Sequence, residues 1–227
     1  ADKNFEDTYA IFEDINSDGT PDLIVASGGN NIHSEKELFK TRIYFNNGSG
    51  KFEPSPFEIP STQHNSSIIA PQDFDDDGDT DLFIGSRSVP GTYGINPDHL
   101  LLENIGKGQF KDVTEAKAYE LNEVGMITDA TWADMNGDAL KDLIITGDWI
   151  SPKIFITGEN GFEKMESELE NYSGAWNDVE AADLNNDGKT DLVLANRGVN
   201  SFYNPDDQHP VKIYINDFDN NGTIEQI

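Results

Sequence analysis

Short apolar runs separated by polar, glycine-rich turns dominate the chain, and the periodicity of amphipathic helices is almost absent. The runs at 23–26 and 143–145 are continuously apolar, as is expected of strands buried on both faces. Four other runs are rich in β-prone residues, at 42–46, 100–104, 153–157 and 212–216. Only residues 115–124 carry a helical signal. The pattern predicts an all-β chain.

Tight turns are predicted at the ends of these runs. Asn-Gly-Ser-Gly at 47–50 and Gly-Lys-Gly at 106–108 supply residues that tolerate the positive φ of a hairpin, and 159–162 is a shorter version. Each unit therefore reads as strand, Asp-rich loop, strand, variable loop, strand, Gly hairpin, strand. Four strands in about 50 to 60 residues is typical of a β-propeller blade. We predict a single array of blades at 1–65, 66–124, 125–173 and 174–227, the last of them incomplete.

An Asp-rich loop occurs four times, and a related fifth copy follows. Successive copies begin 59, 61, 49 and 34 residues apart, and positions are counted from the first Asp of each. Side-chain oxygens at positions 1, 3, 5 and 9 can converge with the backbone carbonyl of position 7, while Gly at position 6 supplies a sharp turn. Such an all-oxygen cage favours Ca²⁺ over Mg²⁺. The expected ligand positions are Asp14, Asn16, Asp18, Thr20 and Asp22; Asp73, Asp75, Asp77, Asp79 and Asp81; Asp134, Asn136, Asp138, Leu140 and Asp142; Asp183, Asn185, Asp187, Lys189 and Asp191; and Asp217, Asp219, Asn221, Thr223 and Glu225.

The loops differ from EF-hands and from one another. Position 12, a bidentate Glu in EF-hands, lies here within an apolar strand, so each loop is expected to join two strands. The second loop has four carboxylates and should bind most strongly. The third has Ala139 at position 6, and because a left-handed Ala costs about 1 kcal/mol, that site should be weaker or distorted. The fifth either replaces a Gly hairpin or begins a new element after an incomplete unit. The competing interpretation, that Asp, Asn and Gly are ordinary turn formers, is disfavoured by four copies in register.

Composition restricts the partners. The chain has 43 acidic and 15 basic residues and a net charge of −28, which argues against nucleic acid and anionic membranes because both need basic faces. The absence of cysteine excludes disulfides and thiolate metal sites, and no apolar run is long enough for membrane insertion. Sixteen of the acidic residues stand at positions 1, 3, 5 and 9, where the side chain is the expected ligand, so much of the charge is accounted for by metal binding.

At these loops, the apolar strands after them and the Asn-x-Gly-x-Gly-x-Phe hairpins, the sequence resembles the FG-GAP/VCBS repeat family of integrin α-subunits and bacterial secreted or surface proteins. The Phe-Gly and Gly-Ala-Pro elements are poorly kept, so the likeness is nearer to the bacterial VCBS type. It implies four-stranded blades and Ca²⁺ at about four sites with a candidate fifth. It also implies an extracellular, cell-surface or periplasmic location. Since family propellers commonly have seven blades, we expect a partial propeller of about four blades from a longer protein, whose open edges could self-associate.

The connections after the second strands are expected on the face opposite the Asp loops. They carry an Arg and aromatic mixture suited to carbohydrate, peptide or carboxylate ligands, or else scattered packing residues. We predict a calcium-binding extracellular module for binding or adhesion to a carbohydrate or protein ligand. The alternatives are a segment of a polysaccharide-acting enzyme and a purely structural scaffold. No catalytic motif is present, which disfavours an enzyme, and the four histidines are expected to be exposed. The candidate ligand-face residues are Arg87, Tyr93, Trp149, Arg197 and Tyr203.

Overall fold

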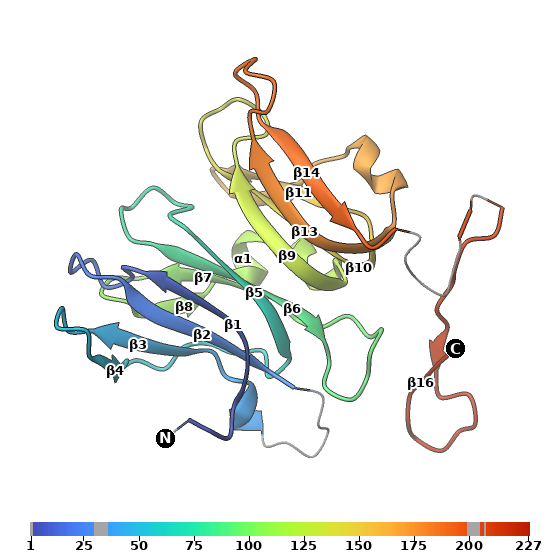
Figure 1. The fold of residues 1–227 in the computed structure, drawn as a ribbon, viewed down its shortest axis with the longest axis horizontal. Helices are drawn as coiled ribbons and strands as arrows, with labels where there is room; N and C mark the ends of the chain where they lie inside the picture. The colour runs from blue at the N-terminus through green and yellow to red at the C-terminus, as the bar shows by residue number, and fades with distance from the viewer. Residues whose placement is uncertain (1, 30–35, 199–204, 207) are drawn as a thin grey trace.

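The computed structural model describes residues 2–29, 36–198, 205–206 and 208–227 (Figure 1). Its sheets are antiparallel throughout, which confirms the all-β prediction. The first two units are four-stranded sheets with strands in sequence order. Their strands are β1 (Glu6–Glu13), β2 (Asp22–Gly28), β3 (Arg42–Asn46) and β4 (Phe52–Pro54), then β5 (Asn65–Gln72), β6 (Asp81–Ser88), β7 (Leu100–Asn104) and β8 (Phe110–Asp112).

The third unit repeats this order and is bridged to the fourth where Asp148 of its second strand pairs with Ala175. The strands are β9 (Met126–Ala133), β10 (Asp142–Ile150), β11 (Lys153–Gly158), β12 (Gly161–Lys164), β13 (Gly174–Ala182), β14 (Asp191–Asn196), β15 (Ile215–Asn216) and β16 (Glu225–Gln226). The short helices are α1 (Thr114–Lys117) and the 3₁₀ turns η1 (Lys36–Phe39), η2 (Tyr119–Glu123) and η3 (Glu168–Asn171). The helical signal at 115–124 thus coincides with α1 and η2. No described helix is long and apolar enough to cross a membrane.

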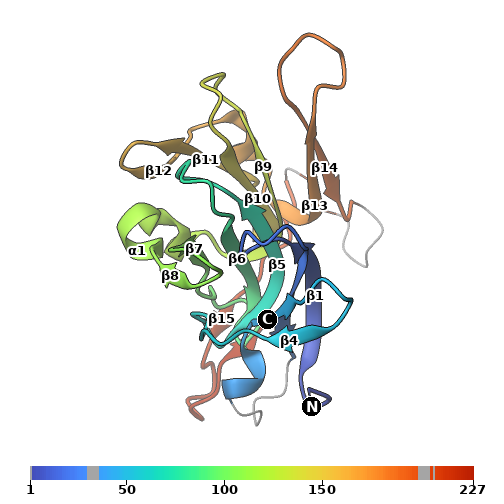
Figure 2. The ribbon, with the colours of Figure 1, turned by 90° about the vertical axis from the view of Figure 1, so that its left-hand side faces the viewer.

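The units are arranged as a fan whose first strands, β1, β5, β9 and β13, are neighbours (Figures 1 and 2). Hydrogen bonds cross between these strands. The Ser67 hydroxyl donates to the carbonyl of Ile127 at 2.6 Å, and the Thr128 hydroxyl donates to the carbonyl of Trp176 at 2.7 Å. The second, third and fourth units are therefore fixed to one another along their inner strands.

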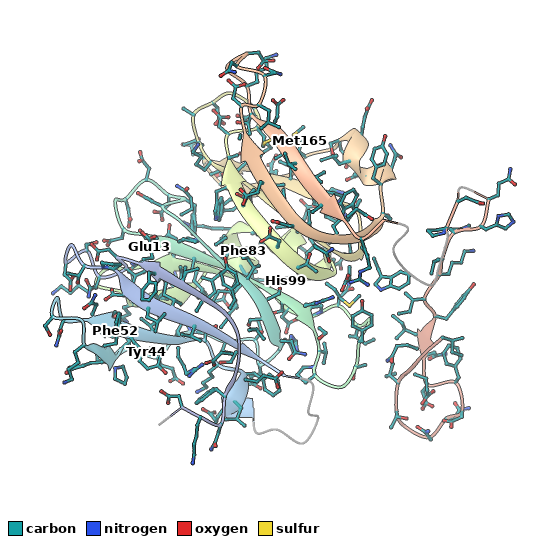
Figure 3. The ribbon with its side chains drawn as sticks, viewed as in Figure 1. Glu13, Tyr44, Phe52, Phe83, His99 and Met165 are labelled. Atoms are coloured by element: carbon teal, nitrogen blue, oxygen red, sulfur yellow. The ribbon has the colours of Figure 1, made fainter. Side chains whose placement is uncertain are left out.

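The core lies between the units. Ile24, Phe83 and Ile144, on the strands that follow three Asp loops, are fully buried. Phe83 belongs to a cluster shared by the second and third units (Figure 3), and Ile24 to one shared by the first two. Burying each such side chain contributes roughly 1.5–3 kcal/mol. This is why these strands are continuously apolar, as the sequence predicted.

The fourth unit departs from the repeat. Residues 212–216 were expected to form its third strand, but β15 pairs with β16, and β14 has no such partner among the described residues. The fifth Asp loop follows directly and closes its own hairpin, and Ile213 and Ile215 pack against Gly94 of the β6–β7 connection. Among the described residues, the fourth unit therefore has two paired strands, and the fifth loop closes a separate hairpin after them.

His99 contradicts the prediction of exposed histidines, because it is buried (Figure 3). Its Nδ1 accepts the amide of Ser86 at 3.1 Å, and its Nε2 lies 3.0 Å from the carbonyl of Gly125. Burial lowers the pKa of His99 to about 3, so it is a neutral link between the second and third units. His64 is half-buried and His209 is exposed, whereas His33 lies outside the described residues.

Candidate metal centres and a candidate ligand site

All five Asp loops close a strand pair in the same register, because the residue before position 1 pairs with position 9. Positions 4 and 6 have positive φ in every loop, for example Ser17 at +59° and Gly19 at +87°. In Figure 1 the first four loops lie along the upper left of the fan, whereas the β6–β7 connection extends from the opposite end. The five register pairs are Glu13 with Asp22, Gln72 with Asp81, Ala133 with Asp142, Ala182 with Asp191 and Asn216 with Glu225.

A common hydrogen-bond network holds the loop oxygens inward. In the first loop, Asp14 accepts the amide of Gly19 at 2.8 Å, and Asp18 accepts the amide of Thr20 at 2.9 Å. The same two bonds, from position 6 to position 1 and from position 7 to position 5, occur in the other four loops. Because each oxygen has two lone pairs, these bonds orient the oxygens and leave acceptor capacity for a cation.

The position-9 carboxylates of the first three loops, Asp22, Asp81 and Asp142, are fully buried. Asp81 accepts the amides of Asn104 at 2.7 Å and Phe74 at 3.0 Å, which ties the loop to β7. Burial raises the pKa of Asp81 to about 7 despite these bonds, and the charges of Asp75 and Asp77 add to the rise. Burial raises the pKa of Asp22 and Asp142 as well.

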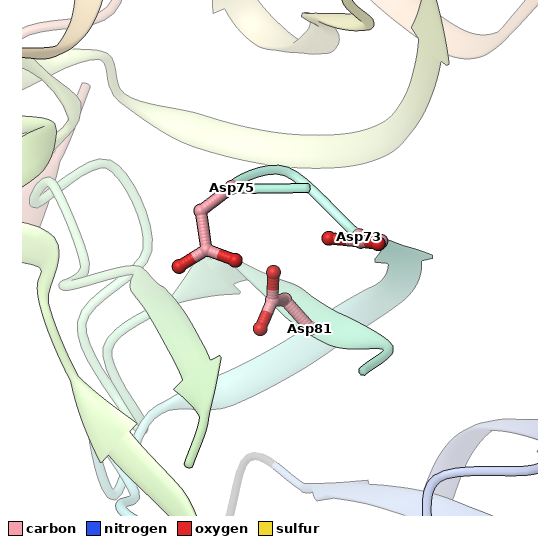
Figure 4. Close-up of side chains that lie close together, drawn as sticks. All are labelled: Asp73, Asp75 and Asp81. Carbon is pink, nitrogen blue, oxygen red and sulfur yellow. The ribbon is translucent and has the colours of Figure 1, made fainter. Parts of the chain in front are cut away.

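The donor set fits a hard cation. Oδ2 of Asp22 is buried and has no hydrogen-bond partner among the described residues. In the second loop, Asp73, Asp75 and Asp81 each place an oxygen within 4.8 Å of the others (Figure 4). Asp217, Asp219 and Glu225 do the same in the fifth. The other three loops have Asn at position 3 and so offer an amide oxygen there. A buried carboxylate without a counter-charge is costly, and a divalent cation would relieve that cost.

Lys117 of α1 is a neighbour of the second loop that the sequence did not reveal. Its Nζ lies 3.3 Å from Oδ2 of Asp75, 3.0 Å from Oε2 of Glu103 and 5.2 Å from the centre of the Phe74 ring. Burial opposes its charge, but the hydrogen bonds to these two carboxylates outweigh burial and raise the pKa of Lys117. A fixed positive charge therefore adjoins the loop that was predicted to bind Ca²⁺ most strongly.

Replacement of Lys117 is expected to strengthen calcium binding. Removing one positive charge a few ångströms from the ion is worth about 1 kcal/mol at a partly exposed site, so Lys117→Gln should tighten one binding step roughly fivefold in a calorimetric titration. Lys111→Gln, which removes the same charge from an exposed residue of β8, should leave the affinity unchanged. Equal affinities in both variants would show that Lys117 does not compete with the ion.

The third loop keeps the common backbone but not every bond. Ala139 adopts φ +73° where the other loops have Gly. Oδ1 of Asp134 accepts the amide of Gly137 at 2.6 Å, whereas in the other four loops the equivalent oxygen accepts the amide of position 5. One hydrogen bond of this loop therefore differs from those of the other four loops, and its lower affinity stays a prediction.

Ala139→Gly is expected to stabilise the protein by about 1 kcal/mol, because Gly reaches this φ without strain. The melting temperature should rise by roughly 2–4 °C. Gly137→Ala is the matched control, since Gly137 has φ +86° in the same loop and its Cβ would meet no atom within 4 Å. It should lower the melting temperature by a similar amount. A lower melting temperature for Ala139→Gly would contradict the backbone strain inferred at Ala139.

Four of the five candidate ligand-face residues surround one buried carboxylate, Asp148 of β10. Arg87 donates to its Oδ2 through Nε at 2.9 Å and Nη2 at 2.7 Å, and the Tyr93 hydroxyl donates at 3.1 Å. Nη2 of Arg197 lies 3.8 Å from Oδ1. Trp149 donates its Nε1–H to the Tyr93 hydroxyl at 3.1 Å. The fifth residue, Tyr203, lies outside the described residues. The sequence did not single out Asp148 itself as a candidate site residue.

A polar cleft of about 460 Å³ adjoins this cluster through Arg87, which lines it. The first strands of all four units contribute hydroxyl and amide side chains to its wall, including those of Thr8, Asn65, Thr128 and Asn177. These groups can both donate and accept hydrogen bonds. The cleft and the cluster therefore form one continuous region with hydrogen-bonding groups, two guanidinium groups and two aromatic rings.

Comparisons with known proteins agree with this geometry. A model of the FG-GAP-like repeat matches residues 14–84 and 73–145, and a model of the FG-GAP repeat matches 175–214. Among curated proteins, no sequence matches the chain. A solved structure of an Agrocybe aegerita lectin, reported for its recognition of non-reducing terminal N-acetylglucosamine, is similar with a TM-score of 0.53 and 17% identity over 84% of this chain. The chain spans 47% of that lectin, and the likeness concerns the fold alone. Because the repeat models match most of its length, the chain belongs to the FG-GAP repeat family.

Proposed function

We propose that this chain is a calcium-stabilised segment of a β-propeller that serves as an extracellular binding or adhesion module for a carbohydrate or protein ligand. The observation that carries the proposal is the repetition of one loop geometry five times, with buried carboxylates at position 9 in three copies. Turn formation alone does not call for a buried acid, whereas a bound cation would offset the charge of one.

Calcium would be held by the side chains at positions 1, 3, 5 and 9 and the backbone carbonyl of position 7. The ion supplies a positive charge that cross-links the loop to the strands it joins and offsets carboxylate repulsion. The chain's own contribution is orientation, through the amide bonds to Asp14 and Asp18 and their equivalents. Since Ca²⁺ is abundant outside cells, this requirement supports an extracellular, cell-surface or periplasmic location. A bacterial origin stays a prediction.

The fan of four units supports a single partial propeller over residues 1–227 as the architecture. Its first strands face a shared centre, as the inner strands of blades do. The edge strand β14 lacks an outer neighbour among the described residues, so its open edge could pair with a strand of another segment or of a second copy.

An enzyme is less well supported. Asp129 and Asp178 both line a second cleft, where burial above all, and also the neighbouring carboxyl of Asp178, raise the pKa of Asp129 to about 6. Glycoside hydrolases hold two carboxyl groups at defined separations, about 5 Å or 6.5–9.5 Å apart. One raised pKa beside a second carboxyl does not by itself make such a catalytic pair, so a binding module is better supported than an enzyme.

Calcium stoichiometry and glycan screening test the proposal. Native mass spectrometry should find four to five Ca²⁺ per chain, and Asp73→Ala should remove one. A glycan and protein array should show calcium-dependent binding without product formation. A chain that binds no calcium would overturn the calcium claim. Release of new reducing ends would favour the enzyme, and failure to bind any ligand would leave only a scaffold.

A further inference from the structure

The cluster around Asp148 occupies one repeated position in three successive units. Arg87, Asp148 and Arg197 each stand 14 residues after the first Asp of their loop, at the end of the second strand. The first unit has Gly28 there. Arg87 and Arg197 are two of only three arginines in the chain. The fold therefore brings two rare cations to either side of one acid, at the end away from the Asp loops.

Asp148 orients the two guanidinium groups without using up their charge. It is only 1% exposed, and its Oδ2 is satisfied by Arg87 and Tyr93. Arg197 is an ion-pair neighbour at 3.8 Å, but its guanidinium donates no hydrogen bond to any described residue, and its side chain is 48% exposed. Within this cluster two cations face one anion, on a chain of net charge −28, while Glu6 lines the adjoining cleft. Such a site selects for an anionic group.

Trp149 is held in a conformation that two of the other three units assign to glycine. It has φ +65°, and the equivalent residues Gly29 and Gly198 have φ +112° and +58°. A bulky residue at positive φ is an outlier that persists where the surroundings enforce it, often at functional sites. The register between β10 and β13 shifts here, and such bulges re-aim side chains. Trp149 is 39% exposed, and among the described residues its indole makes one hydrogen bond, from Nε1 to Tyr93, so part of its ring is available to a ligand.

We propose that Arg87, Arg197, Tyr93 and Trp149, organised by Asp148, bind the carboxylate and ring of an acidic saccharide, with neighbouring sugar units in the polar cleft. Guanidinium groups pair with carboxylates in a planar, two-point geometry. An aromatic ring beside them suits the apolar face of a pyranose. The cleft wall of hydroxyl and amide groups matches sugar hydroxyls better than it matches the apolar side chains of a peptide. This inference rests on the proposed binding function and specifies its ligand class.

Titration with tri-galacturonate and its uncharged methyl ester tests the role of charge. The calcium-loaded protein should bind the acid at least tenfold more tightly than the ester. Arg197→Gln should weaken binding of the acid at least tenfold and leave the ester unaffected. Lys51→Gln, which removes the same charge from an exposed lysine paired with Glu53, should change neither. Equal binding of acid and ester, or an Arg197→Gln variant with normal affinity, would overturn the carboxylate site.

Trp149→Gly tests the ring separately from the fold. Since Gly accepts positive φ, the variant is expected to fold, while binding tri-galacturonate at least tenfold more weakly. A lower melting temperature with unchanged affinity would show that Trp149 is a packing residue and overturn its role. Binding of neutral glycans alone would overturn the acidic class while the module function stands. Binding of an acidic peptide with no saccharide bound would overturn the saccharide class.

Discussion

Excess chelator is expected to lower the melting temperature of this protein by roughly 14 to 28 °C. Each loop with Ca²⁺ at ten times its Kd contributes about 1.4 kcal/mol by mass action, and five loops contribute about 7 kcal/mol. For a chain of 227 residues each kcal/mol is worth roughly 2–4 °C. Calorimetric melts with 1 mM Ca²⁺ and with EGTA measure the difference directly.

The calcium-free protein is expected to have a low stability against unfolding for a second reason. Asp22, Asp81 and Asp142 are buried, and burial raises the pKa of each, so ionising them without a cation costs stability. A carboxyl whose folded pKa lies above its unfolded value stabilises the fold below the unfolded pKa, and this stability is lost as pH rises through the folded pKa. For Asp81 that loss falls between about pH 4 and pH 7, so the EGTA melt should be lowest at and above neutral pH. An unchanged melt in excess EGTA at pH 7.5 would refute structural calcium.

The loops and their strands were predictable because their causes are local. Asp14, Asn16 and Asp18 bond to amides only two to five residues away, and Gly19 is needed for one left-handed turn. The apolar strands follow from burial between repeated units, and repetition made both signals visible in a single sequence. Ala139 shows how local the rule is, since even without Gly the third loop keeps the left-handed backbone.

Contacts between units could not be predicted in this way. Lys117 reaches Asp75 across 42 residues, and His99 is buried by its contact with Gly125 of the next unit. His99 was expected to be exposed because it was taken to be a loop residue with no packing neighbours. Asp148 could have been found by aligning the repeats, because it shares its position with Arg87 and Arg197. The prediction that residues 212–216 form the third strand of the fourth unit was wrong, because β16, which follows the fifth loop, is a closer pairing partner for β15.

Asp81→Ala is expected to destabilise the calcium-loaded protein by about 3–5 kcal/mol, or roughly 6–20 °C. The substitution removes a fully buried acceptor and leaves the amides of Phe74 and Asn104 without a hydrogen-bond partner. Each unpaired buried amide costs about 1–3 kcal/mol. The variant also removes a calcium ligand, so the loss should shrink in EGTA, where the buried charge is itself unfavourable. Thermal melts in both buffers separate the two contributions.

Asp191→Ala is the matched control because Asp191 holds position 9 of the fourth loop in a different setting. It is half-buried and accepts one loop amide, from Leu184 at 3.0 Å, with no third strand beside it among the described residues. Because this variant loses one partly solvated hydrogen bond, its loss of stability in EGTA should be about 1 kcal/mol. The difference in stability loss between the two variants therefore measures how much the carboxylate stabilises the fold by linking neighbouring strands. Equal losses would mean that β7 gains nothing from Asp81, and that the loop contributes to stability through calcium alone.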